Sequence, residues 1–334
     1  MNIDHLLTPY KLNKPAIEGS GIKGTFNSHA VDCPTPFFHK GKWHLMFVGF
    51  DGRGYQTAVS DSDDLVHWSE PMLILKRGSH MKWDNVGMAG CTILMSNDLY
   101  AGNRLRKIDG KYWLMYHSYP DYGYESGPAQ IGLCWTEDEK LLDWNFYGEP
   151  VYTPLEGAPW ENGGLYKSWL IEHNGTFYMF YNAKNNNPKG WNEQIGVATS
   201  KDMIKWERYD KNPVIRNDKA SWDSDFCADP MVFWDSREEQ WVMFYYGLGP
   251  LSACDGIAVS KDLFSWKKFP IPVLTTGRDS EAIDSIYAHK PGICVKDGVL
   301  YHFYCACRPS KPDDKTAGLT GEHRCISVAR SIPW

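Results

Sequence analysis

The chain has 334 residues and a formal net charge of −6. Hydrophobic residues make up 43% and aromatic residues 14%, which is enough for a large packed core and excludes an intrinsically disordered chain. The acidic balance, without a run of Lys or Arg, argues against nucleic acid or an anionic membrane as the main partner. The expected partner is a small molecule or a neutral polymer, and the sequence does not fix the oligomeric state.

The N-terminus and the cysteines bear on the compartment of the protein. The first 15 residues lack a cationic segment followed by an apolar stretch, and no run of about 18 apolar residues occurs, so a cytoplasmic protein is predicted unless a leader was removed. The nine cysteines are scattered, as expected for buried reduced thiols. Cys305 and Cys307 form a C-x-C pair without a second pair or a His at ligand spacing, which favours core packing over a zinc site.

A repeat that recurs five times is the strongest indication of the architecture. In chain order, each copy opens with a short stretch: DCPTPFF at 32, GCTILM at 90, KSWLIE at 167, DPMVFW at 229 and KPGICV at 290. An aromatic stretch such as GKWHLMFVG or EQWVMFYYG follows, bounded by turn residues as strands are. A third, alternating stretch runs into Trp68, Trp144, Trp206, Trp266 or Trp334. A fourth carries Pro and an apolar pair, as in EPMLIL, EPVYT, NPVIR and IPVLT.

Four strands in each of five copies predict an all-β, five-bladed β-propeller with four antiparallel strands per blade. The blades are expected at about 26–75, 83–153, 160–215, 222–274 and 284–334. The last copy lacks its outer strand, and YKLNKPAI at 10–17 is similar to YDKNPVI at 209–215. The N-terminal segment is therefore expected to supply that strand and close the ring, which removes an open edge. No linker-like run divides the chain, so 1–334 is predicted to be one domain.

The residue that starts each innermost strand is expected near the mouth of the central channel. These five positions are Asp32, Gly90, Lys167, Asp229 and Lys290. Small or apolar residues would suffice for a purely structural ring, whereas two Asp and two Lys make a pocket of mixed charge. Burying such charges is costly unless they are paired or solvated. A ligand site on the channel axis is therefore predicted.

Three features of the sequence resemble the furanosidase-type glycoside hydrolases. Inner strands begin with Asp-x-Pro or Asp-Pro, other strands are of the GKWHLMF and FYMFYNA kind, and the third stretch repeats as in GVATSKDMIKW. This superfamily includes families 43, 62, 32, 68, 117 and 130. The resemblance covers nearly the whole chain but does not resolve the family. It implies an oligosaccharide substrate and no cofactor. It allows a structural cation such as calcium in the central channel, for which the sequence has no ligand signature.

The resemblance implies three catalytic residues, because glycosidic cleavage uses two carboxylates and a third Asp orients the sugar. Asp32 matches the first-blade general base or nucleophile, and Asp229 matches the orienting Asp-Pro, although it falls in blade four. Glu161, in PWENGG, stands where family 43 has its general acid. Because Glu161 shares its repeat position with Asp84 and Asp223, a structural role in the loop is the competing interpretation. The other candidates for the acid are Glu156, Glu125, Glu281, Asp284 and His289.

Further residues are expected to bind the substrate. Lys167 and Lys290 would either neutralise the two Asp or bind an anionic group of the substrate. Arg104, in the insertion YAGNRLRKIDG, either reaches the rim of the pocket or is solvated. Family 117 uses a His in a comparable acid role, which keeps His289 among the candidates. The predicted substrate-binding set is Lys167, Lys290, His289, Trp160, Asp223 and Arg104, and no metal ligand is predicted.

Together these features predict a glycoside hydrolase that removes a terminal furanoside or related sugar from an oligosaccharide. The first-blade DCP resembles the inverting families more than the NDPNG of the retaining fructan enzymes. A closed pocket would suit exo-action. Two alternatives stay open: a phosphorylase of the family 130 type, in which Lys167, Lys290 and His289 hold phosphate, and a non-catalytic sugar-binding propeller.

Overall fold

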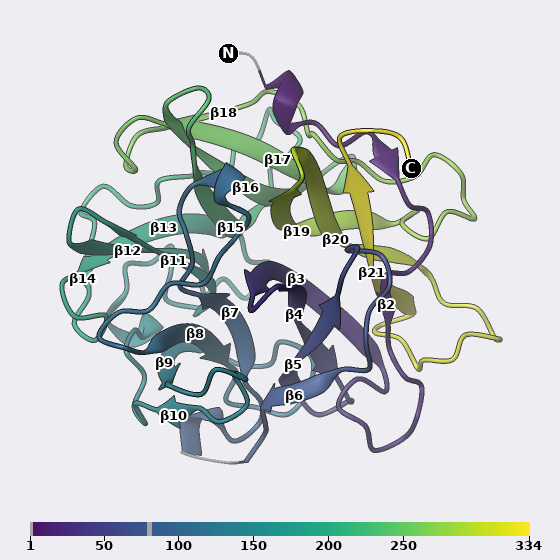
Figure 1. Ribbon diagram of the computed structural model, residues 1–334, viewed down its shortest axis with the longest axis horizontal. Helices are drawn as coiled ribbons and strands as arrows, with labels where there is room; N and C mark the ends of the chain where they lie inside the picture. Colours follow the sequence, from purple (N-terminus) through teal and green to yellow (C-terminus); the bar gives the residue numbers. More distant parts are fainter. Residues whose placement is uncertain (1–2, 79–81) are drawn as a thin grey trace.

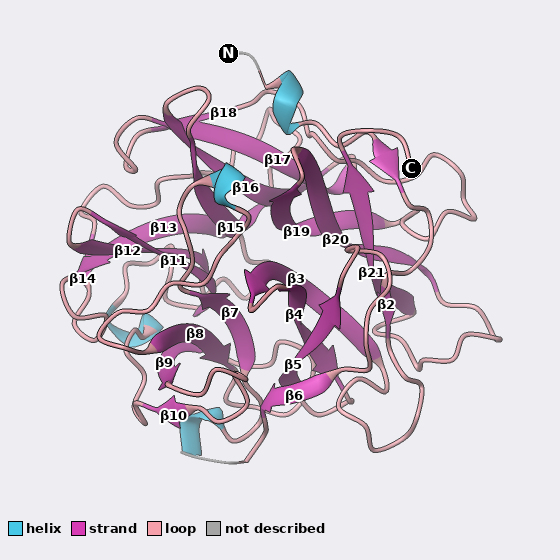
Figure 2. Cartoon of the chain, viewed as in Figure 1, coloured by secondary structure: helices cyan, strands magenta, loops and turns pink. Residues whose placement is uncertain are grey.

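The computed structural model describes residues 3–78 and 82–334, and this part of the chain is built almost entirely of strands (Figure 2). Its helices are single 3₁₀ turns at Asp4–Leu6, Lys82–Asp84, Leu99–Ala101 and Pro154–Glu156. The predicted all-β class is confirmed. No helix within the described ranges is long and apolar enough to cross a membrane.

Antiparallel pairing groups the described strands into five successive sets arranged around a common centre (Figure 1). The first set is β3 (Ala30–His39), β4 (Lys42–Phe50), β5 (Tyr55–Ser62) and β6 (Met72–Leu75). The second is β7 (Ala89–Ile93), β8 (Tyr112–Ser118), β9 (Gln130–Thr136) and β10 (Asn145–Phe146). The third is β11 (Gly164–His173), β12 (Thr176–Lys184), β13 (Glu193–Ser200) and β14 (Glu207–Arg208). The fourth is β15 (Phe226–Asp235), β16 (Gln240–Gly249), β17 (Ser252–Ser260) and β18 (Trp266–Lys268).

The fifth set contains the last strands of the chain and the N-terminal segment. β19 (Tyr287–Lys296), β20 (Val299–Pro309) and β21 (Glu322–Arg330) pair in order. β1 (Tyr10–Lys11) and β2 (Ile17–Glu18) then pair antiparallel with β21. The predicted pairing of residues 10–17 with the last copy is therefore confirmed. β3 of the first set also contacts β19 and β21, so the first and last sets lie side by side.

The outer strands differ from the expectation in the second, third and fourth sets. There the short outer strand begins at or just after the repeated Trp, at β10, β14 and β18. The Pro-containing stretch that follows makes only isolated bridges to the third strand, at Tyr152, Ile215 and Leu274. Only in the first set does this stretch form a strand, β6. A proline has no amide hydrogen to donate to a ladder, which fits its place at the periphery.

Each innermost strand carries a β-bulge, and four of the bulges have a non-glycine residue with a positive φ. The register shifts lie after Asp32, Gly90, Tyr166, Ala228 and His289. The residues with positive φ are Cys33, Lys167, Asp229 and Lys290, at 56°, 38°, 51° and 66°. Positive φ is costly for residues with a Cβ and clusters at functional sites. These four bulges therefore aim a chosen side chain toward the centre.

The bulges correct the predicted equivalence of Asp32. Asp32, Ala228 and His289 hold equivalent positions. Each pairs with the second-strand residue that directly follows the aromatic residue at the middle of that strand. Cys33, one residue later, takes the place of Lys167, Asp229 and Lys290. The predicted position in the first copy is therefore one residue too early, whereas the other four positions, Gly90, Lys167, Asp229 and Lys290, are equivalent as predicted.

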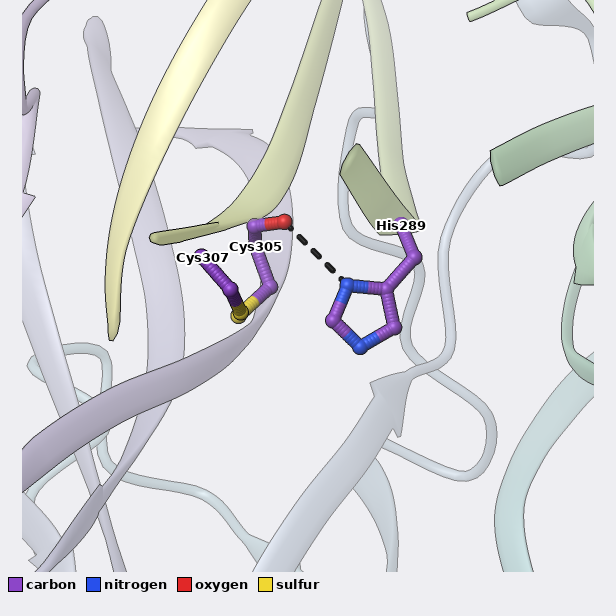
Figure 3. A group of neighbouring side chains, drawn as sticks. All are labelled: His289, Cys305 and Cys307. Carbon is purple, nitrogen blue, oxygen red and sulfur yellow. Dashed lines mark hydrogen bonds between the residues drawn. The ribbon is translucent and has the colours of Figure 1, made fainter. Parts of the chain in front are cut away.

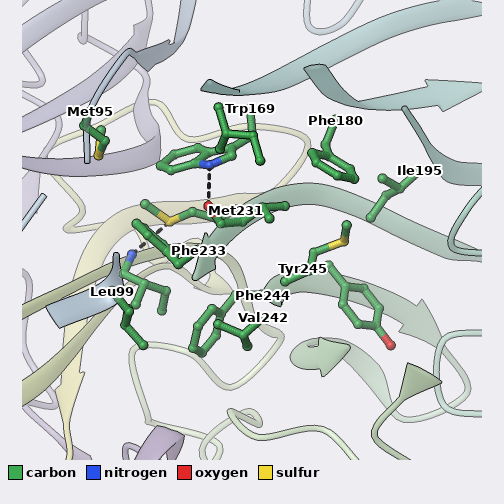
Figure 4. Packing of buried hydrophobic residues seen from close by; sticks show 14 of the residues in the cluster. Met95, Leu99, Trp169, Phe180, Ile195, Met231, Phe233, Val242, Phe244 and Tyr245 are labelled. Carbon is green, nitrogen blue, oxygen red and sulfur yellow. Dashed lines mark hydrogen bonds between the residues drawn. The ribbon is translucent and has the colours of Figure 1, made fainter. Parts of the chain in front are cut away.

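The largest hydrophobic cluster lies where several inner strands meet (Figure 4). Trp169 of β11 packs against Phe233 of β15, with ring centroids 5.3 Å apart. Its indole N–H donates to the Val232 carbonyl at 2.7 Å, so the buried donor has a partner. The Ile293 amide of β19 lies 3.1 Å from the Met231 sulfur. These contacts between sets hold the inner strands in a fixed relation to one another.

The repeated Trp–acid pair that precedes the inner strands has a packing role. Tyr116, Tyr181 and Tyr245, from the second strands, stack on Trp83, Trp160 and Trp222. Their hydroxyls donate to Asp84, Glu161 and Asp223 at 3.0, 2.7 and 2.9 Å. The opposite residue is Gly132, Gly196 or Gly256, and a Cβ at Gly132 would lie 2.3 Å from the Tyr116 ring. The motif thus locks a tyrosine within each of these three sets.

Candidate active site

A pocket lies where the inner-strand bulges converge, and residues of all five sets line it. We call it the inner pocket. The bulges contribute Cys33, Lys167, Asp229 and Lys290, as the charge pattern predicted for the last three. The other lining residues come from the second strands, from the starts of the third strands and from the loop between β8 and β9; they include His117, Asn182, Tyr246, Tyr55, Glu193 and Glu125.

Glu193, the first residue of β13, is a buried carboxyl group held by three donors. Asn182 donates to Oε2 at 2.9 Å, Tyr246 donates to the same oxygen at 3.3 Å, and the Trp191 indole donates to Oε1 at 3.0 Å. Burial, followed by the negative charge of Glu125, raises the pKa of Glu193 to about 7. A carboxyl group that keeps its proton near neutral pH is suited to general acid catalysis.

Glu125 is the second carboxylate of the pocket wall. It has a positive φ of 48° in the loop between β8 and β9. Tyr55 donates to its Oε1 at 3.2 Å, and the Lys290 ammonium lies 3.7 Å from the same oxygen. One third of its side chain is exposed, at 33%, so water and substrate can reach it. It faces Glu193 closely enough for its charge to perturb that group.

Asp229 and Lys167 present polar atoms to the inner pocket. Asp229 is 5% exposed, and its Oδ2 atom has no hydrogen-bond partner among the described residues. Burial raises the pKa of Asp229 to about 6, against the opposing charges of Lys290 and Lys167. A buried acceptor without a partner costs about 1–3 kcal/mol. A hydroxyl group of a bound ligand could satisfy this acceptor.

Asp32 lies behind the pocket wall in a buried ion cluster. Its Oδ2 atom is 2.7 Å from Lys290 Nζ and 3.3 Å from Arg324 Nη1, and its Oδ1 atom accepts from the Cys33 amide at 2.9 Å. Burial alone would raise the pKa of Asp32, but the charges of Lys290 and Arg324 hold it well below its usual range. Cys33, not Asp32, lines the inner pocket. The structure therefore places Asp32 next to Lys290 and does not place it in the pocket wall.

Glu161, Trp160 and Asp223 belong to the packing motif and lie outside the inner pocket. The Glu161 carboxylate accepts from Tyr181, from the Ala158 amide at 3.1 Å and from Arg208 Nε at 3.0 Å. Asp223 accepts from Tyr245 and from Lys268 at 2.7 Å. These partners are fixed parts of the sheets. The structural interpretation of Glu161, left open by the sequence, is the one that its surroundings match.

Glu161→Gln is therefore expected to lower stability and leave catalysis intact. An amide has one acceptor oxygen for three donors and brings an NH₂ group toward Arg208, so the free energy of unfolding should fall by about 2 kcal/mol. Denaturant unfolding measures this, with Asp84→Asn as the matched change in another set. A Glu161→Gln variant of unchanged stability that has lost its activity would contradict this role.

His289 lies beside the cysteine pair Cys305 and Cys307 (Figure 3). One candidate ligand atom from each residue falls within 4.8 Å of the others, and the two sulfurs are 3.7 Å apart. However, His289 Nδ1 is already within 3.2 Å of the Cys305 carbonyl. Burial lowers the pKa of His289 to about 3, with Lys290 and Arg324 contributing, and burial raises that of Cys305 well above its usual value. As placed, the group is a neutral packed cluster.

Arg104 and the remaining acid candidates do not line the inner pocket. The Arg104 guanidinium lies over the Phe38 ring at 4.7 Å, on the exposed side of the chain. Asp284 accepts from Tyr304 at 3.0 Å in the fifth set, as the acids of the packing motif accept from their tyrosines. Glu281 lies 71% exposed beside Lys311. Glu156 lies in the 3₁₀ turn before Trp160. Of the alternatives to Glu161 as the acid, Glu125 alone lines the inner pocket, and His289 lines the pocket beside it.

Glu193 is the pocket residue that the sequence prediction missed. In each set, one residue of the third strand pairs with the central aromatic residue of the second strand, and Glu193 lies three residues before that residue in the third set. The same position in the other sets is held by Tyr55, Ala129, Ala253 and Arg324. These residues share no chemistry that a structural rule would require. The comparison that identified the inner-strand starts would have found Glu193 if it had been extended to the third strands.

Comparison with known proteins defines the class. Residues 94–268, more than half of the chain, match the family described as "Glycosyl hydrolases family 32 N-terminal domain". The chain belongs to this family. It is thus placed among the glycosidases, in agreement with the superfamily that the sequence resembled.

Particular relatives lie on both sides of the hydrolase and phosphorylase boundary. The chain is 28% identical over 158 residues to a "Beta-1,2-mannobiose phosphorylase" of Thermoanaerobacter sp. (strain X514), covering 42% of this chain and 50% of the relative. It is 29% identical over 167 residues to a "Levanase" of Bacillus subtilis (strain 168), covering 47% and 22%. The chain thus spans half or less of the length of these curated relatives. A solved structure described as "Glycoside hydrolase" is 28% identical, with a TM-score of 0.79 over 98% of this chain and 93% of that one.

Proposed function

We propose that the protein is a glycoside hydrolase that removes a terminal sugar from an oligosaccharide in the inner pocket. The observation that carries the proposal is the position of Glu125 and Glu193. Both line the inner pocket, and both also line a second, more open pocket next to it. A glycosidic bond that joins a sugar in one pocket to a sugar in the other would pass between these carboxylates. Cleavage needs two carboxylates that flank the bond.

The surroundings of the two groups suit different roles in this chemistry. Glu193, with a pKa of about 7, would protonate the leaving oxygen. Glu125, beside the Lys290 ammonium and open to water, would act on the other side of the bond, on water or on the sugar directly. Asp229 would accept a hydrogen bond from a hydroxyl group of the terminal sugar. Asp32 would hold Lys290 in place and act through it.

The finer features of the sequence prediction are part of the same proposal. We infer that the five sets of strands are the blades of one closed propeller and that 1–334 is a single domain. Exo-action on a furanoside or a related glycoside is part of the same proposal, because a pocket at the meeting point of the inner strands suits the end of a sugar chain better than its middle. Inversion stays a prediction from the resemblance. The anomer that first appears in a proton NMR time course tests it.

A panel of 4-nitrophenyl furanosides and pyranosides, assayed with and without phosphate, tests the proposed function. The wild type should release nitrophenol from at least one member in phosphate-free buffer, at a rate that phosphate does not raise, because water is the acceptor. Release of a free reducing sugar confirms hydrolysis. Absence of release from every member, under both conditions, would contradict catalysis and favour the sugar-binding alternative.

A phosphorylase is the second candidate, supported by the mannoside phosphorylases among the relatives. It needs a cationic site for phosphate. Lys167 lines the inner pocket, but Lys290 and Arg324 already share Asp32, and burial leaves His289 uncharged near neutral pH. This arrangement favours water over phosphate. Turnover that requires phosphate and yields a sugar phosphate would decide for the phosphorylase.

A further inference from the structure

The second pocket, which we call the outer pocket, adjoins the inner pocket and has about 590 Å³ of empty volume. Glu125, Glu193, Tyr246 and Lys290 line both. The rest of the wall of the outer pocket is formed by Tyr124, Leu248, Ala253, His289, Glu322 and Arg324 and by three aromatic residues at or near strand starts, Trp191, Phe226 and Tyr287. We call these three residues the aromatic wall.

The aromatic wall is built on residues at strand starts and is anchored on several sides. Phe226 begins β15 and pairs in parallel with Glu193, and its ring stacks with that of Trp191 at 6.0 Å and 19°. Lys184 Nζ lies 5.4 Å from the Trp191 ring centroid. Even so, Trp191 remains 48% exposed. An exposed indole in a concave site marks a surface that binds a ligand.

Trp191 is also bonded to the carboxyl group between the two pockets. Its indole N–H donates to Glu193 Oε1 at 3.0 Å. Trp191 therefore lines the outer pocket and also contacts Glu193, the group that we propose to protonate the leaving oxygen. A ring that packs on Trp191 would be held within reach of Glu193.

The charges of the outer pocket indicate a neutral ring. Arg324 is paired with Glu322 at 2.8 Å and with Asp32, and it accepts no further anion without losing one of them. Lys290 is paired with Asp32 and Glu125. His289 is buried and T-shaped to Tyr246 at 5.2 Å. Among the described residues, the cations of this pocket already have carboxylate partners, so a carboxylate or phosphate on the ligand has no cation of its own there.

We propose that the outer pocket binds the leaving group of the reaction, a neutral sugar ring that packs on the aromatic wall, and that Trp191 positions Glu193 against its glycosidic oxygen. This inference rests on the proposed function and adds the second half of the substrate to it. The C–H face of a sugar ring is apolar and suits an aromatic surface, while its hydroxyls reach the polar rim. Trp191 is thus both a binding residue and a positioning residue.

Pairs of substrates that share a glycosyl group but differ in leaving group provide the test. For each sugar that the wild type accepts, the probes are a disaccharide and the glycosyl fluoride. Fluoride has no ring to stack and needs little protonation. Trp191→Ala should lower kcat/KM for the disaccharide by about 10- to 100-fold and leave that for the fluoride close to wild type.

Trp191→Phe separates the two roles of the side chain. Phenylalanine keeps the ring but removes the N–H that stabilises the ionised form of Glu193. Most of the disaccharide activity should remain, while the basic limb of its pH profile moves to higher pH. Trp334→Ala is the matched control, since Trp334 is 43% exposed and lines neither pocket. This variant should have the same kcat/KM as the wild type for both substrates.

The outcomes separate this inference from the proposed function. If the wild type hydrolyses neither fluoride nor disaccharide, the proposed function is wrong and the inference falls with it. If the wild type hydrolyses both, but Trp191→Ala loses activity on both equally or on neither, the proposed function stands and the leaving-group site is wrong. Equal pH profiles for Trp191→Phe and the wild type would overturn the positioning role.

Discussion

Glu193→Gln should lower kcat/KM for an oligosaccharide by about 10²- to 10⁴-fold, the usual contribution of a general acid. Glutamine keeps the shape of the side chain and can still accept from Asn182 or Trp191, so the fold should tolerate the change. It has no proton to give to the leaving oxygen. The loss should shrink for a 2,4-dinitrophenyl glycoside, because that leaving group departs without protonation.

The pH profile gives an independent readout of the same residue. Burial and the charge of Glu125 raise the pKa of Glu193 to about 7. An acid acts in its protonated form, so wild-type activity should fall as the pH rises through about 7, and this basic limb should be missing in Glu193→Gln. A variant that keeps the basic limb would show that another group supplies the proton.

Asp32→Asn should lower the free energy of unfolding by about 3–5 kcal/mol at neutral pH, because it leaves Lys290 and Arg324 without their shared anion in a buried site. The folded-state pKa of Asp32 lies below the unfolded value of about 3.9. The contribution of ionised Asp32 to the free energy of unfolding is therefore complete above a pH of about 4, and it is lost as the pH falls through the folded-state pKa. The stability gap between wild type and variant should narrow in acid.

Urea unfolding at several pH values measures this gap. Asp297→Asn is the matched control, since Asp297 pairs with Lys296 at 2.8 Å on the surface with 83% of its side chain exposed. That exposed pair should contribute about 0–1 kcal/mol. If Asp32→Asn were as stable as the wild type but had lost catalysis, Asp32 would act on the substrate directly, as the family resemblance implied.

The repeat in the sequence was sufficient to predict the three inner strands of each set, because each copy carries the same alternation of apolar and turn residues. It also located the bulge residues Lys167, Asp229 and Lys290, whose charges no packing rule explains. The equivalence failed for Asp32, where an Asp-x-Pro stands in place of Asp-Pro. The distance of seven residues from Trp160 to Lys167 and from Trp222 to Asp229 also separates Phe26 from Cys33, and it would have given the right register.

The position of Glu193 stands out when the third strands are compared, but its role as the acid could not be predicted from the repeat, for a physical reason. Glu161 stands in a conspicuous Trp–Glu motif, but that motif recurs because a tyrosine hydroxyl needs a buried acceptor in each of three sets. Glu193 stands at the start of an ordinary third strand. Its raised pKa depends on Glu125, Asn182 and Tyr246, which come together only in the folded chain. Sequence spacing does not encode such a meeting of loops.

The most direct test of the central claim compares Glu193→Gln with Glu161→Gln on one oligosaccharide that the wild type hydrolyses. Both variants replace a buried glutamate with its amide, but one glutamate lines both pockets and the other lies in a sheet-packing motif. With kcat/KM expressed per folded enzyme, Glu193→Gln should lose about 10²- to 10⁴-fold and Glu161→Gln should match the wild type. Equal losses, or a larger loss in Glu161→Gln, would contradict the assignment of the active site.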